Sequence, residues 1–156
     1  MIRTATPADV PTIAALIREL AEYERLGDQV QPNEARLADH LFGPRPFCEC
    51  LIAETGGGPV GFALFFYSYS TFGVCPKLYL EDLFVRPEAR GGGHGRALLE
   101  ALARRAVERG CGRMEWSVLT WNEPAIGFYR RLGAGPADGW TVYHLRGEAL
   151  AALAAG

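Results

Sequence analysis

The sequence predicts a single α+β domain over residues 1–156, with a mixed, mostly antiparallel sheet flanked by helices. The stretch Lys77–Val85 is an almost continuous apolar and aromatic run, which is typical of a strand buried on both faces. A glycine-rich turn at residues 90–96 follows it, and apolar residues at helical spacing follow the turn. Upstream, Phe47–Glu54 and Val60–Tyr67 flank a glycine-rich loop and therefore predict an antiparallel hairpin.

Capping residues, prolines and glycines mark the other elements of the chain. Taken in order, we expect a strand at Ile2–Ala5, a helix from Thr6 to about Arg25, a short helix after Asn33, a loop at Tyr69–Pro76, a strand at Arg113–Leu119, a helix between Asn122 and Gly133, a strand at Trp140–Leu145 and a terminal helix at Glu148–Ala155.

Composition excludes several classes of function. The net charge of −2 offers no basic surface for nucleic acid or for an anionic membrane. No stretch approaches the roughly 20 apolar residues of a membrane span, and the first residues hold no apolar signal core, so we expect a cytoplasmic protein. The four cysteines form no CxxC pair and the three histidines are scattered, so we expect neither disulfides nor a metal site.

The glycine turn indicates a phosphate ligand. A strand, a glycine turn and a helix present a row of backbone N–H groups at the positive end of the helix dipole. The dinucleotide pattern does not fit, and the turn has no phosphate-binding lysine, because Lys77 is the only lysine in the chain. The pattern present is Arg-x-x-Gly-x-Gly, formed by Arg90, Gly93 and Gly95.

This pattern resembles the acyl-coenzyme-A loop of the GNAT superfamily of N-acetyltransferases. Three further blocks extend the resemblance along nearly the whole chain, and they are most similar to the branch of spermidine/spermine (diamine) and thialysine N-acetyltransferases. They are Ala21-Glu22-Tyr23-Glu24, Tyr79-Leu80-Glu81-Asp82-Leu83-Phe84-Val85, and Trp121-Asn122-Glu123-Pro124-Ala125-Ile126-Gly127-Phe128-Tyr129.

The resemblance implies acetyl-CoA as donor, a small-molecule primary amine as acceptor, direct transfer without an acyl-enzyme, and a homodimer. It makes Tyr129 the acid that protonates the leaving thiolate and Glu81 the water-linked base, and it places Glu24, Glu81 and Asp82 near the acceptor. The residues it assigns to the cofactor are Leu83, Phe84, Val85, Arg90, Gly91, Gly92, Gly93, His94, Gly95, Arg96, Asn122 and Tyr129.

The chemistry of amine acetylation fits these residue types. An amine with a pKa of about 10.4 is almost entirely protonated at neutral pH, so a base must take its proton. A carboxylate in a partly buried strand suits this role, because burial raises its basicity. Glu81 and Asp82 are neighbours and point to opposite faces of a regular strand unless a bulge re-aims one of them. By periodicity alone, Tyr129 is also compatible with a core aromatic, and Asn122 with a simple helix cap.

Alternatives remain open at this point. The chain is also compatible with a non-catalytic acyl-CoA-binding module, or with acetylation of another small amine or a peptide N-terminus. A polyamine would need several acids, and Glu22 and Asp28 are further candidates, whereas an amino acid would need a cation such as Arg25 or Arg45 for its carboxylate. The loop Ser68–Pro76 differs from that of the polyamine enzymes.

Overall fold

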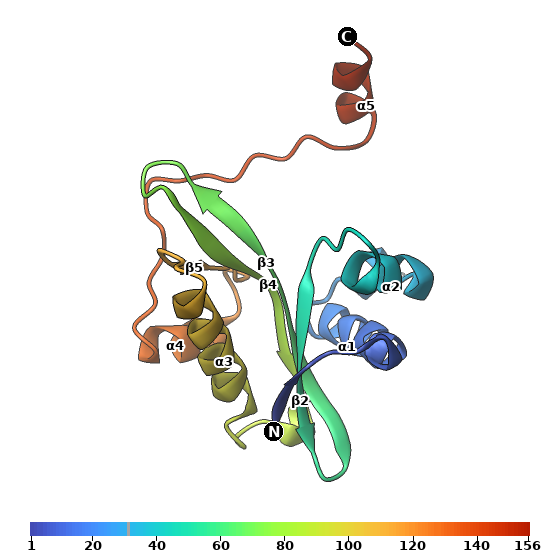
Figure 1. Ribbon diagram of the computed structural model, residues 1–156, viewed down its shortest axis with the longest axis vertical. Helices are drawn as coiled ribbons and strands as arrows, with labels where there is room; N and C mark the ends of the chain where they lie inside the picture. The colour runs from blue at the N-terminus through green and yellow to red at the C-terminus, as the bar shows by residue number, and fades with distance from the viewer. Residues whose placement is uncertain (31) are drawn as a thin grey trace. The chain divides into compact units, whose positions relative to one another are not determined.

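The structure is a computed structural model that describes residues 1–30 and 32–156 (Figure 1). The chain forms two compact units, residues 1–117 and residues 118–156, which we describe one after the other. That all 156 residues form one domain stays a prediction.

The first unit contains one five-stranded sheet whose strands follow one another in chain order. They are β1 (Ile2–Thr4), β2 (Glu49–Thr55), β3 (Gly58–Ser70), β4 (Cys75–Val85) and β5 (Met114–Glu115). Every neighbouring pair is antiparallel except β4 and β5, which are parallel. The expected mixed, mostly antiparallel sheet is confirmed.

Three helices cover the two faces of this sheet. The helices α1 (Val10–Tyr23) and α2 (Glu34–Phe42) lie on one face and α3 (His94–Glu108) lies on the other (Figure 1). Short 3₁₀ turns occur at Pro7–Asp9, Gly27–Gln29 and Pro87–Ala89.

Apolar residues at helical and strand spacing form the core on each face. On the α1 and α2 face, the fully buried side chains include Ile13, Leu16, Ile52 and Phe62. On the other face, α3 contributes the buried residues Leu98, Leu99, Leu102 and Ala106. Burial of each large apolar side chain contributes about 1.5–3 kcal/mol, so the two layers hold β3 and β4 firmly between them.

A charged cluster fixes the first strand to the start of α1. Arg3 donates two hydrogen bonds of 2.8 Å to the carboxylate of Asp9 and one of 2.6 Å to Glu54. The amide and hydroxyl of Thr6 also donate to Asp9, at 2.8 and 2.9 Å. The guanidinium of Arg3 and these bonds together hold the pKa of Asp9 well below its ordinary value.

The β3–β4 hairpin is longer than the sequence indicates. Strand β3 continues to Ser70 and β4 begins at Cys75, so the loop expected at Tyr69–Pro76 is wrong except at the turn itself. The residues at this end of the hairpin do not alternate regularly between apolar and polar, and side chains such as Tyr69 are exposed there. The backbone ladder persists without that alternation.

The second unit contains α4 (Glu123–Arg131) and α5 (Gly147–Ala155). The strand expected at Trp140–Leu145 is wrong, because the structure assigns no strand there and the side chains of Trp140 and Tyr143 are exposed. A segment with a strand-like sequence pattern forms a strand only where a neighbouring strand pairs with its backbone N–H and C=O groups.

Candidate active site

A β-bulge lies where the sequence places the two adjacent acids. In the register of β3 and β4, Leu64 is opposite Asp82 and Phe65 is opposite Leu80, so Glu81 is the extra residue. Directly opposite residues share a face of the sheet, and Leu64 belongs to the core under α1 and α2. Asp82 therefore lies on the α1 and α2 face.

Three acids predicted to bind the acceptor are brought together at this bulge. Glu24 lies directly after α1, and its charge and that of Glu81 both act on Asp82. Burial, followed by these two charges, raises the pKa of Asp82 from 3.8 to about 6. Burial also raises the pKa of Glu24. Three neighbouring carboxylates repel one another in the ligand-free protein. A bound ammonium group would reduce this electrostatic repulsion.

The burial expected for Glu81 is wrong, because its side chain is exposed. As the extra residue of the bulge it is displaced from the regular pleat, and a strand buried on both faces is interrupted there. The argument that burial raises the basicity of a carboxylate therefore applies to Asp82.

The strand segment that the resemblance assigns to the cofactor has one open edge. Leu83, Phe84 and Val85 pair with β3 on one side, whereas within the described residues β5 pairs with β4 only at Leu78 and Tyr79. Apart from the carbonyl of Val85, which accepts a hydrogen bond from Arg90, backbone groups on the β5 side of this segment are therefore available to a ligand that lies along the strand.

The glycine turn has the backbone that a phosphate site needs. Gly91 and Gly93 have φ angles of 80° and 77°, which residues with a Cβ adopt only with strain. The amides of the first helical residues His94, Gly95 and Arg96 have no acceptor within α3, whereas Ala97 is the first whose amide bonds back, to Gly93 at 2.9 Å. These free donors and the helix dipole favour an anion.

The two arginines that the resemblance assigns to the cofactor are engaged elsewhere in the structure. Arg90 donates to the carbonyl of Val85 at 3.0 Å and lies 4.6 Å above the ring of Tyr23. Arg96 donates to Glu100 at 2.8 Å across one helical turn. Gly92 has a neighbour as well, since a Cβ there would lie 3.0 Å from Nε2 of His94.

The second unit holds the other two predicted residues. Asn122 is buried and caps α4, since its Oδ1 accepts a hydrogen bond of 3.4 Å from the amide of Ala125. Tyr129 is half-buried in α4, and its ring lies 5.5 Å from the ring of Phe128. Their roles toward the cofactor stay predictions.

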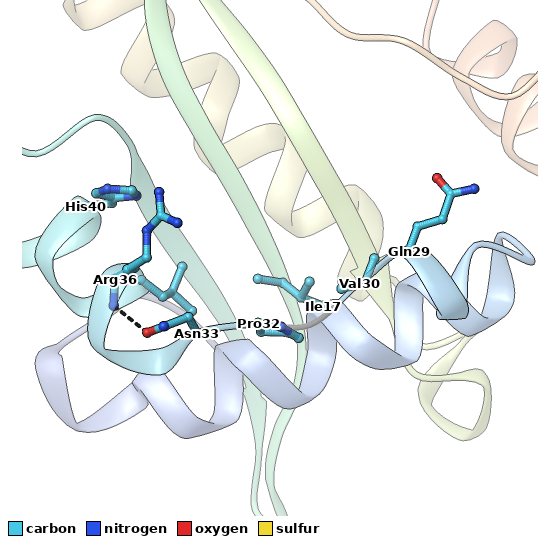
Figure 2. Close-up of a pocket in the computed structure, with 8 residues that line it drawn as sticks. Ile17, Gln29, Val30, Pro32, Asn33, Arg36 and His40 are labelled. Carbon is cyan, nitrogen blue, oxygen red and sulfur yellow. Dashed lines mark hydrogen bonds between the residues drawn. The ribbon is translucent and has the colours of Figure 1, made fainter. Parts of the chain in front are cut away.

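A cavity of about 370 Å³ lies between α1 and α2 (Figure 2). None of the site residues predicted from sequence lines it. Its lining includes Arg36 and His40, which stand one turn apart on α2. That spacing was visible in the sequence, but nothing in the sequence indicated a cavity beside it.

The described residues contain neither a metal cluster nor a membrane-spanning helix. Over residues 1–30 and 32–156, no group of three or more His, Cys, Asp and Glu side chains is arranged to hold a metal ion. Within the same ranges, no helix is long and apolar enough to span a bilayer.

A bulged strand, an open strand edge and a glycine turn beside it are compatible with an acyl-CoA-dependent transferase. Comparison with known families agrees: residues 13–134 match the Acetyltransferase (GNAT) family. This chain belongs to the GNAT family of acetyltransferases and is an enzyme of that class. The family match implies acetyl-CoA as cosubstrate.

Curated relatives and solved structures are similar over nearly the full chain. A thialysine N-epsilon-acetyltransferase of Bos taurus is 42% identical over 99% of this chain and 96% of its own. An L-ornithine N5-acetyltransferase of Arabidopsis thaliana is 34% identical over 97% of this chain and 86% of its own. An integron cassette protein of V. cholerae has a TM-score of 0.84 at 27% identity, covering 100% of this chain and 98% of its own. Such relatives indicate acetylation of an amine.

Proposed function

We propose that this enzyme transfers acetyl from acetyl-CoA to a primary amine of a small molecule, either a thialysine-like amino acid or a diamine or polyamine. The observation that carries the proposal is the cluster of Glu24, Glu81 and Asp82 at the bulge of β4, beside the proposed cofactor strand. The names of the relatives, which act on thialysine and ornithine, support an acceptor with a primary amine.

The acid cluster attracts the ammonium form of the acceptor and then takes its proton. Asp82, whose pKa is about 6, is the carboxylate best matched to accept this proton at neutral pH. In the alternative assignment, the exposed Glu81 accepts the proton through a water molecule. Separate variants, Glu81→Gln and Asp82→Asn, distinguish the two.

The free amine attacks the thioester carbonyl carbon directly. The resulting oxyanion is stabilised by a backbone N–H on the open edge of β4 near Leu83, the C–S bond breaks, and the departing thiolate takes a proton from Tyr129. The turn at residues 90–96 and the segment Leu83–Val85 hold the cofactor. The proposed reaction uses no metal, and we propose a cytoplasmic homodimer as its setting.

The test is acetyl-CoA consumption over a panel of putrescine, spermidine, spermine, thialysine, lysine and an aminoglycoside. Tyr129→Phe is expected to slow turnover at least about tenfold, about 1.4 kcal/mol of barrier, with acetyl-CoA affinity nearly unchanged. Tyr143→Phe makes the same change at an exposed tyrosine and is the matched control. An unchanged rate in Tyr129→Phe would refute its role, and CoA binding without turnover on any amine would favour a binding module.

A further inference from the structure

The cavity between α1 and α2 has a lining of unusual composition for a surface hollow. Part of it is apolar, and the rest is polar or cationic, with no carboxylate (Figure 2). The lining residues are Ile17, Gln29, Val30, Pro32, Asn33, Arg36, Leu37 and His40. Apolar side chains beside the guanidinium of Arg36 favour an anionic group attached to an alkyl chain.

Arg36 is the group in this cavity best able to bind an anion. Its backbone amide is taken by the Asn33 cap at 3.0 Å, but its exposed guanidinium forms no ion pair with any acid in the described part of the chain. Figure 2 shows the side chains of Arg36 and His40 next to each other on the same side of α2. A guanidinium binds a carboxylate through two parallel hydrogen bonds, and an imidazole can donate a third.

The cavity lies on the same face of the sheet as the acid cluster. The Sγ of Cys48 donates to the carbonyl of His40 at 3.9 Å. Burial and then the charge of Glu81 raise the pKa of the same thiol. Ile17 and Leu37 of the cavity pack with Cys48 on one core. Leu64, which lies opposite Asp82, belongs to the same core. The cavity and the acid cluster are therefore on the same face of the sheet.

We propose that this cavity binds the α-carboxylate of an amino-acid acceptor through Arg36, with His40 as a second donor, while the distal amine of the acceptor extends to Glu81 and Asp82. The inference rests on the proposed function and names its acceptor class. A diamine has no carboxylate that Arg36 could bind. Arg25 and Arg45, the cations considered from sequence, do not line the cavity.

Matched acceptors separate the carboxylate from the amine. Lysine, its carboxamide lysinamide and its decarboxylated analogue cadaverine share the same distal amine. We expect wild-type kcat/KM to be at least about tenfold higher for lysine or thialysine than for lysinamide or cadaverine. Arg36→Gln should lower kcat/KM for the amino acids about 10- to 100-fold, mainly through KM, and leave lysinamide and cadaverine within about twofold.

Two further variants control this experiment. Arg18→Gln changes an exposed arginine of α1 outside the cavity and should alter no acceptor. Arg36→Lys keeps the charge without the planar fork and should retain an intermediate preference for the carboxylate. Melting temperatures verify that each variant is folded, and His40→Gln gives an independent test of the rim if Arg36→Gln does not fold.

The outcomes are distinguishable. If wild type prefers diamines, or if Arg36→Gln and His40→Gln lower all acceptors equally, the carboxylate site is refuted and amine acetylation stands. If wild type acetylates no amine on the panel, the proposed function fails and this inference fails with it.

Discussion

Replacement of Asp82 by asparagine should stabilise the ligand-free enzyme while it impairs acetyl transfer. Asp82 is partly buried beside Glu24 and Glu81, and its pKa of about 6 lies above the ordinary 3.8. A raised pKa means that the charged form is disfavoured in the folded state relative to the unfolded chain. The destabilisation of the folded state by charged Asp82 is therefore absent below pH 3.8 and fully present above pH 6.

The magnitude follows from the same values. A difference of about 2 pH units corresponds to about 3 kcal/mol, because each unit contributes about 1.36 kcal/mol. The asparagine side chain would carry no charge at any pH, so above about pH 7 the variant should be more stable by at most about 3 kcal/mol. At about pH 5 the advantage should fall to about half of that, because wild-type Asp82 is then mostly protonated when folded.

Urea unfolding of wild type and Asp82→Asn at about pH 5, 6, 7 and 8 measures this difference. Asp138→Asn, the same change at an exposed side chain, is the matched control. A stability difference that does not grow across this pH range, or a variant that is less stable than wild type at its alkaline end, would refute the assignment of Asp82 as a desolvated acid.

Two further predictions concern the frame of the site. Asp9→Asn should cost about 3 kcal/mol at neutral pH, because it removes one of the two charged partners of Arg3 and leaves Glu54 as the other. Since the pKa of Asp9 is lowered, the loss should shrink as the pH falls below about 4 in urea unfolding. Gly61→Ala should lower the melting temperature at a cost of about 1–3 kcal/mol, since a Cβ there would lie 2.5 Å from the carbonyl of Phe84, whereas Gly56→Ala meets nothing within 4 Å and should be nearly neutral.

Much of the fold follows from patterns that reflect burial directly. Ile13 and Leu16 on one helix and Leu98 and Leu102 on another keep helical spacing because each helix has one buried face. The glycine turn was predictable for a different reason, since Gly91 and Gly93 adopt backbone angles that favour glycine. Helical spacing and the glycines of a turn depend only on nearby residues, so both can be predicted from the sequence.

Features that depend on a neighbouring segment were not predictable. The pattern of Trp140–Leu145 is that of a strand, but no pairing follows from pattern alone. The exposure of Glu81 depends on the register between two strands, which its own residues do not specify. The cavity beside Arg36 depends on the crossing of two helices, whose packing distance sequence does not reveal.

The bulge at Glu81 also determines where this strand tolerates a change of length. Phe66 is opposite Tyr79 and Leu64 is opposite Asp82, so Tyr79 and Asp82 share a face only because Glu81 is the extra residue between them. Removal of Glu81 would leave every other pairing of the two strands in register. Removal of Leu83 would instead force the residues on one side of the gap onto the opposite face. A library of single-residue deletions through β4 should therefore retain the most folded protein at Glu81, although the Glu81 deletion would lose one acid of the proposed acceptor site.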